Sequence, residues 1–170
     1  LQILAFFAGV GRSEGVFLIQ ADDFLGHQTA ETIMRFAGKA RQVDQVMLDF
    51  AAEIWGELAR PTPEAIARRA DNGSGVLNYL FPFLGPALKR FLEELPAPRS
   101  GLTRTEATTL AALANGTATV ADLFRRLIAS EAAPFMGDLS FFCILAHLCG
   151  CTRPLLDMPN PRIDPQSDPQ

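Results

Sequence analysis

The feature that most limits the possible fold is a set of helix start and stop signals in the second half of the chain. Thr103 and Glu106 stand three residues apart, which is the spacing of a capping box. In such a box the threonine hydroxyl accepts a hydrogen bond from an amide of the first turn, and the carboxylate accepts one from the amide of the cap. Asn115-Gly116 supplies the left-handed conformation that ends a helix. The predicted buried stripe of this helix consists of Ala107, Leu110, Ala111 and Ala114.

Two further helices are predicted after this stop signal. Thr119 stands three residues before Asp122 and is expected to cap the second helix. Asp138, directly after Gly137, is expected to be the N-cap of the third helix, which ends at Gly150. The predicted buried stripe of the third helix consists of Phe141, Ile144, Leu145 and Leu148.

Residues 152–156 are a candidate edge strand behind the third helix. Three short helices and a strand in this order resemble a helix-turn-helix or winged-helix-like unit. A helix that reads DNA in this way needs nearby Lys or Arg side chains to meet the phosphates. Residues 138–149 contain neither, so we do not expect specific nucleic-acid binding and favour a unit that packs on its neighbour.

The first half of the chain contains one strand signal. Residues 16–20 form an apolar run, which is typical of a buried, parallel strand. Asp22 and Asp23 follow its carboxyl end, where open α/β sheets bind ligands. Together with His27 they could hold a metal ion or a ribose, and the alternative is a solvated turn. No convincing second strand is evident in this half.

The segment between these two parts has helical periodicity. The strongest signal covers residues 43–58, which keep apolar side chains on one face. Pro96 and Pro98 stop the last helix of the segment, because proline lacks an amide hydrogen and clashes with the preceding turn. The other helices predicted here cover residues 29–38, a stretch that begins at Pro63, residues 76–84 and residues 84–95.

These signals predict a mainly α-helical chain. Its N-terminal region is expected to be the remnant of an α/β, Rossmann-like region, and its C-terminal region is expected to be helical and helix-turn-helix or winged-helix-like. The predicted organisation is a partial α/β segment over residues 1–28, a helical region over 29–96, a helix-turn-helix-like unit over 97–156 and a proline-rich, disordered tail over 157–170.

Composition narrows the class of protein. The chain is 48% hydrophobic and 20% charged, which is typical of globular proteins. Its net charge of −4 excludes a polyanion-binding surface and a polybasic membrane patch. No apolar run reaches the length of a membrane span, and three cysteines, an odd number, fit a reducing compartment. We therefore expect a cytoplasmic protein without a membrane partner, and the sequence leaves open whether it uses a cofactor.

One cluster of residues resembles a metal site. Cys143 and His147 stand four residues apart on a predicted helix and share a face, as zinc ligands do. Cys149 and Cys151 follow, but their C-x-C spacing differs from the usual C-x₂-C, and Cys143 is expected to lie among Phe and Leu side chains. A free cysteine in a core is therefore favoured, and no metal site is predicted.

The connection over residues 130–138 is predicted to be structural. Glu131 is expected to pair with Arg104 or Arg126. The other assigned residues are Phe135 and Met136, which fill the core, Gly137, which permits the turn, and Asp138, which caps the next helix. With Thr103, Arg104 and Glu106 they form a structural motif, and no catalytic residue is predicted.

Several blocks of the sequence together resemble a known family. They are LQILAFFA, AAEIWGELARPTPEAI, FPFLGPALKRFLEELP, GLTRTEATTLAALANGT and EAAPFMGDLSFFCILAHL followed by RPLL. The family that they resemble is domain of unknown function 1835, an uncharacterised and mainly bacterial family. The resemblance implies a Rossmann-like N-terminal region and a helical C-terminal region, without an activity. Family members usually carry a first strand and an acidic, His-containing stretch before LQILA, so it also implies that Leu1 is not the biological start.

Two classes of function follow from these observations. The favoured one is a non-enzymatic interaction or regulatory module with a protein partner. If it were instead a transcription-associated DNA-binding protein, its affinity for DNA would fall steeply with salt. The alternative class is the C-terminal part of a Rossmann-like nucleotide- or metal-binding enzyme, in which a ligand would raise the melting temperature and Asp22→Asn would abolish the rise. If nothing precedes Leu1, the apolar face over residues 1–8 would be exposed, which further predicts self-association or poor solubility.

Overall fold

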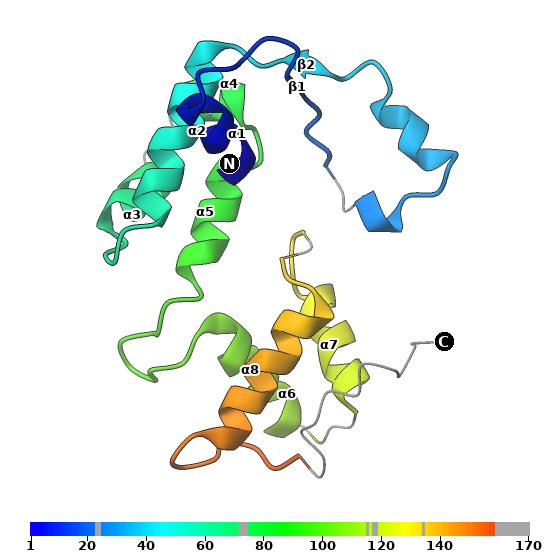
Figure 1. Cartoon of the computed structure of the whole chain (residues 1–170). Helices are drawn as coiled ribbons and strands as arrows, with labels where there is room; N and C mark the ends of the chain where they lie inside the picture. Colours follow the sequence, from blue (N-terminus) through cyan, green and yellow to red (C-terminus); the bar gives the residue numbers. More distant parts are fainter. Residues whose placement is uncertain (23–24, 72–74, 115, 117–118, 134, 159–170) are drawn as a thin grey trace. The chain divides into compact units, whose positions relative to one another are not determined.

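The computed structural model describes residues 1–22, 25–71, 75–114, 116, 119–133 and 135–158. Within them the chain is mainly helical, as the sequence predicts, and it also has one small two-stranded sheet (Figure 1). The chain divides into two compact units, Leu1–Glu94 and Leu95–Gln170. None of the helices in the described ranges is long and apolar enough to cross a membrane. The tail predicted over residues 157–170 lies outside these ranges from residue 159 onward.

The first unit holds five α-helices, two short strands and two 3₁₀ turns among its described residues. In chain order they are α1 (Gln2–Gly9), β1 (Phe17–Leu18), η1 (Leu25–His27), η2 (Thr32–Phe36), β2 (Arg41–Gln42), α2 (Gln45–Leu58), α3 (Glu64–Asp71), α4 (Gly75–Leu80) and α5 (Leu84–Leu92). Pro82 stands between α4 and α5, so the apolar stretch predicted as one helix over residues 76–84 ends earlier.

Helix α2 is the centre of this unit. The Asp44 carboxylate accepts a hydrogen bond from the Met47 amide at 2.8 Å and caps its first turn. The helix buries Met47, Leu48, Ala51 and Ile54, while α1 lies along it (Figure 1). The apolar face predicted within residues 43–58 included Val46, which is exposed. The rest of that face is at least partly buried, and Leu48 is buried in addition. The buried face is therefore rotated slightly from the one that periodicity predicts.

The strand prediction over residues 16–20 is wrong in two respects. β1 pairs antiparallel with β2, with Phe17 opposite Gln42 and Leu18 opposite Arg41, whereas a Rossmann-like unit requires parallel strands. The run is also not buried throughout, because Val16 and Leu18 pack on the core while Phe17 and Ile19 are exposed. No sequence pattern predicted the partner strand, since Arg41-Gln42 is polar.

The helix predicted over residues 29–38 is reduced to the 3₁₀ turn η2. The Thr29 amide donates to the Thr32 hydroxyl at 2.8 Å, and the Thr32 amide donates to the Thr29 hydroxyl at 3.2 Å, so this reciprocal pair stands at the start of the turn. Gly38, at φ 79°, then reverses the chain toward β2.

The second unit contains α6 (Arg104–Ala114), α7 (Val120–Ala129) and α8 (Asp138–Gly150). Both predicted capping boxes are confirmed. The Thr103 amide donates to Glu106 Oε2 at 2.9 Å, and the Glu106 amide donates to Thr103 Oγ1 at 3.1 Å. Thr119 and Asp122 make the same reciprocal pair at α7. The core of the unit is formed by Leu123, Leu127, Phe141 and Leu145.

The predicted buried face of α6 is wrong. Ala107, Ala111 and Ala114 are exposed, and the residues that α6 buries are Thr105 and Thr109. Burial of Thr109 is tolerated because its hydroxyl donates to the Thr105 carbonyl at 2.8 Å. The threonine methyl groups can then serve as apolar surface, which a count of apolar residues does not register.

This reversal of faces gives a direct prediction for α6. Thr109→Ala should lower the free energy of unfolding by about 1–2 kcal/mol, because it removes a buried methyl group and a buried hydrogen bond. Ala107→Lys should change it by less than about 0.5 kcal/mol, because Ala107 is exposed. Urea unfolding followed by circular dichroism measures both. A larger loss for Ala107→Lys than for Thr109→Ala would restore the face that periodicity predicts.

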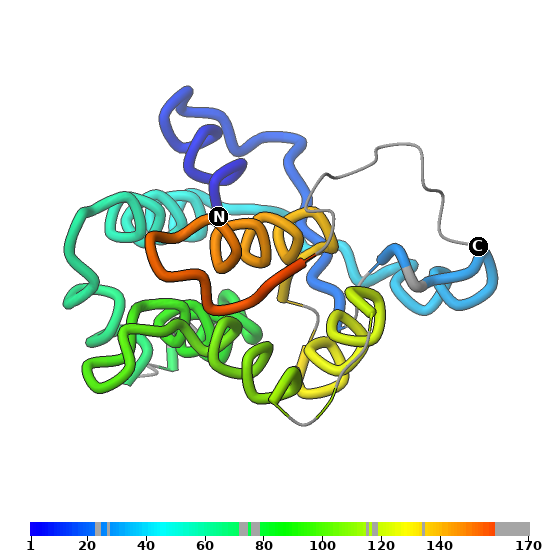
Figure 2. Tube along the Cα trace, turned by 90° about the horizontal axis from the view of Figure 1, so that it is seen from below, coloured from blue at the N-terminus to red at the C-terminus, as the bar shows by residue number. Residues whose placement is uncertain are grey.

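The start of α8 differs from the prediction, whereas its end at Gly150 agrees with it. Gly137 is the N-cap, and Asp138 is instead the first helical residue, where its carboxylate accepts from the Leu139 amide at 2.7 Å. The strand predicted over residues 152–156 is absent from this described stretch. The chain instead folds back along α8 (Figure 2), and the Leu155 amide donates to the Leu148 carbonyl at 3.0 Å. The winged-helix-like detail stays a prediction.

Candidate functional site

The predicted ligand site follows β1, at a point where the chain has already left the sheet. Asp22 is exposed and pairs with Arg35 of η2 at 3.2 Å. Asp23 lies outside the described residues, and of His27 only the backbone in η1 is described. Because β1 belongs to an antiparallel pair, Asp22 does not lie in the crevice of a parallel sheet that motivated the prediction. Its carboxylate instead ties the loop after β1 to η2.

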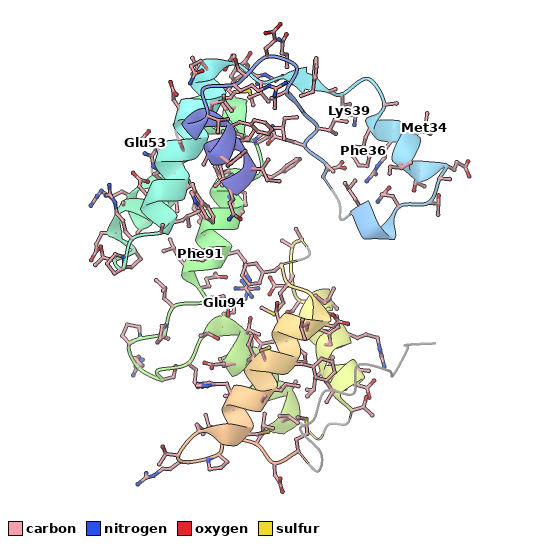
Figure 3. The ribbon with its side chains drawn as sticks, in the orientation of Figure 1. Met34, Phe36, Lys39, Glu53, Phe91 and Glu94 are labelled. Carbon is pink, nitrogen blue, oxygen red and sulfur yellow. The ribbon has the colours of Figure 1, made fainter. Side chains whose placement is uncertain are left out.

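The same loop contains a cation–aromatic cluster that the sequence did not reveal. Phe36 is buried, and its ring centroid lies 4.6 Å from Arg35 Cζ and 5.3 Å from Lys39 Nζ. Figure 3 shows Phe36 and Lys39 on this loop. Cations at these distances are attracted by the ring quadrupole. Arg35 thus contacts both Phe36 and Asp22, and we assign this cluster an ordering role in a segment with little helix.

The cysteines near the C-terminus are free thiols in different surroundings. Cys143 is exposed, so the prediction that it lies in the core is wrong. Cys151 is half-buried, and its Sγ donates to the Leu148 carbonyl at 3.4 Å and to the Arg153 carbonyl at 3.0 Å. Burial raises the pKa of Cys149, and the charges of Asp157 and Cys151 raise it further. No group of three or more metal-ligating side chains is found among the described residues.

The connection between α7 and α8 contains one of the two ion pairs that the sequence offers for Glu131. Arg104 pairs with Glu131 at 3.6 Å, and the Glu131 side chain is almost fully buried. Met136 packs against the core of the unit, and Gly137 provides the extended residue before α8. Phe135 is half-buried, and Pro134 lies outside the described residues. The pair of Arg104 with Glu131 joins the start of α6 to the connection after α7.

An ion-pair network joins α2 to α3, and no sequence pattern predicted it. Arg69 Nη2 donates to Glu57 Oε1 at 2.9 Å, Arg69 Nε also pairs with Glu57, and Glu53 Oε1 lies 2.5 Å from Arg69 Nη2. Glu53 is labelled on α2 in Figure 3. The hydrogen bond from Arg69 holds the pKa of Glu57 below its ordinary value. A carboxylate held ionised in this way is a poor general acid at neutral pH, so we regard the network as structural.

The most unusual surface in the first unit is apolar. On α1, Leu4 is buried against α2, while Ile3 and Phe6 are 73% and 66% exposed. Val10, directly after the helix, is exposed as well. Ile3, Phe6 and Val10 are spaced three and four residues apart and share one side of the helix. We call them the α1 outer face. Of the apolar segment predicted over residues 1–8, Ile3 and Phe6 are therefore exposed in the structure and Leu4 is buried.

A comparison of the chain with protein-family models, curated protein sequences and solved structures finds no match. The resemblance to domain of unknown function 1835 accordingly stays a prediction.

Proposed function

We propose that this chain is a non-enzymatic interaction or regulatory module that binds a protein partner. The observation that carries the proposal is the α1 outer face, where two large apolar side chains are mostly exposed on a helix whose other side is packed. Apolar residues that gather on one side of a surface element are typical of protein contact sites. The three free cysteines suit the reducing cytoplasm, which is where we place the module.

Two observations argue against a nucleotide- or metal-binding enzyme and against a DNA-binding protein. Asp22, the described member of the predicted ligand site, pairs with Arg35, and no group of three or more metal-ligating side chains is found around it among the described residues. Helix α8 exposes Leu139, Ser140 and Cys143 and carries no Lys or Arg, so it has no cation to meet a phosphate. Both observations support a protein partner over a nucleotide or DNA.

The test compares partner capture by the wild-type chain and by a variant with a charged α1 outer face. Ile3→Lys/Phe6→Lys should lose a partner protein that the wild type captures from the native host. Val46→Lys, which adds a charge at an exposed apolar position on α2, should keep it. A partner that binds both variants equally would remove the α1 outer face from the proposal.

A second measurement addresses the enzyme alternative. Nucleotides and divalent metals should leave the melting temperature of the chain unchanged if it is an interaction module. A rise in melting temperature that Asp22→Asn abolishes would overturn the proposal and favour the nucleotide- or metal-binding hypothesis.

A further inference from the structure

The outer edge of β1 has backbone groups that β2 does not use. The Val43 amide donates to the Val16 carbonyl at 2.9 Å, so these two residues form a hydrogen-bonded pair of the ladder. Antiparallel pairs alternate between hydrogen-bonded and non-hydrogen-bonded ones. Phe17, opposite Gln42, is therefore in a non-hydrogen-bonded pair, and its N–H and C=O point away from β2. Within the described residues the sheet has two strands, so no third strand pairs with this edge.

The side chains of this edge add an apolar surface to the free backbone groups. Phe17 is 61% exposed, and Ile19, two residues on, is 48% exposed. Residues 16–20 contain no charged residue and no proline. Natural sheets usually protect an open edge with such residues, because an unprotected edge pairs with another strand. This edge lacks that protection.

We propose that the outer edge of β1 pairs with the same edge of a second copy of the chain. An antiparallel pair about a two-fold axis at Leu18 would join two two-stranded sheets into one of four strands. It would place Phe17 opposite Ile19 of the other copy, twice, by symmetry. Aromatic and β-branched residues form favourable cross-strand pairs. The edge is thus complementary to itself.

The charges that flank the edge do not oppose this pairing. Gly15, at φ 73°, lies between Glu14 and β1 and turns the chain there, so Glu14 does not extend the strand. Asp22, at the other end, is already paired with Arg35. The paired segment is short and buries less surface than a standard interface, so we expect a weak dimer with a dissociation constant above about 10 μM.

The test measures the mass of the full chain by sedimentation over a range of concentrations. The wild type should form a dimer as its concentration rises to about 500 μM. Phe17→Lys/Ile19→Lys should remain monomeric, because lysine on an edge strand opposes pairing. Val46→Lys and Phe6→Lys are the controls, and both should still form the dimer. A wild type that stays monomeric, or a dimer that the Phe17→Lys/Ile19→Lys variant retains, overturns the proposal.

Hydrogen exchange tests the same proposal on the wild type, so it does not require that a substituted chain folds. Amides of residues 16–20 should exchange more slowly in the concentrated sample than in the dilute one, and those of α3 should not change. Exchange that is the same in both samples contradicts strand pairing. The inference is independent of the proposed function: a dimer lost in Phe6→Lys but kept in the β1 variant would move self-association to the α1 outer face.

Discussion

Phe141→Ala is expected to lower the free energy of unfolding of the second unit by about 3–5 kcal/mol. Phe141 is buried at the centre of the core with Leu123, Leu127 and Leu145. Its ring centroid lies 5.5 Å from that of Phe124, so the substitution also removes an aromatic contact. The loss is large because the side chains around this ring are packed, so the helices cannot move together far enough to fill the cavity. Urea unfolding followed by circular dichroism at the helical band measures it.

Leu139→Ala is the matched control for this prediction. Leu139 lies on the same helix, is also a large apolar residue, and is exposed. Its replacement should change the free energy of unfolding by less than about 0.5 kcal/mol. Equal losses in the two variants would mean that α8 buries a different face from the one described.

The parts of the fold that depend on neighbouring residues could be predicted from the sequence. The capping boxes of Thr103 and Thr119 involve residues three positions apart, so both partners are visible in one short window. The end of α8 at Gly150 is similarly local. The ion pair of Arg104 with Glu131 is longer in range, and it could be proposed because few charged residues are near the connection.

The predictions that were wrong concern which side of an element is buried and which segment it pairs with. Both depend on tertiary contacts. Alanine is too small to decide which side of α6 is buried, and Thr109 can be buried because it bonds to the carbonyl four residues before it. The apolar run over residues 16–20 has the composition of a buried strand, but its partner is the polar pair Arg41-Gln42. Strand pairing is non-local, so the apolar run itself determines neither the direction of pairing nor the burial of the strand.

The contacts at the candidate sites are also formed between residues far apart in the sequence, so they could not be predicted. Asp22 was singled out because it follows an apolar run, and its actual partner, Arg35, is 13 positions later in the sequence. The network of Arg69 with Glu57 joins two helices, and no spacing rule within one helix predicts it. Such contacts become visible only once the packing of α2 on α3 is known.

The second large effect is expected in that network. Arg69→Met should lower the free energy of unfolding by about 2–3 kcal/mol, because it leaves the Glu57 carboxylate, 13% exposed, without its guanidinium partner. Arg69 also contacts the face of Phe50, with its Cζ 5.4 Å from the ring centroid, and methionine retains part of that apolar contact. Trp55, the single tryptophan, lies on α2 between Glu53 and Glu57, so its fluorescence reports this unfolding directly.

A second substitution separates the cost of the orphaned carboxylate from the loss of packing. Arg69→Met/Glu57→Met should recover most of the loss and lie within about 1 kcal/mol of the wild type, because an apolar pair replaces an ion pair at little cost. No recovery in the double variant would show that the arginine acts through its packing. Glu53→Gln, at a more exposed partner of the same arginine, should cost less than about 1 kcal/mol.

The effect of Arg69→Met should depend on pH, whereas a loss of packing alone would not. Hydrogen bonding from Arg69 lowers the pKa of Glu57 from its ordinary value of 4.5, so in acid the unfolded chain takes up a proton before the folded one does. The stability that Arg69 confers is therefore complete above 4.5 and is lost as the pH falls through the lower, folded pKa. The difference between wild type and Arg69→Met should shrink from about pH 7 to about pH 3. Glu64 and Asp122 also have lowered pKa values, but they are present in both proteins and cancel in the difference. A difference that stays constant over this range would mean that Glu57 is not the group that Arg69 stabilises.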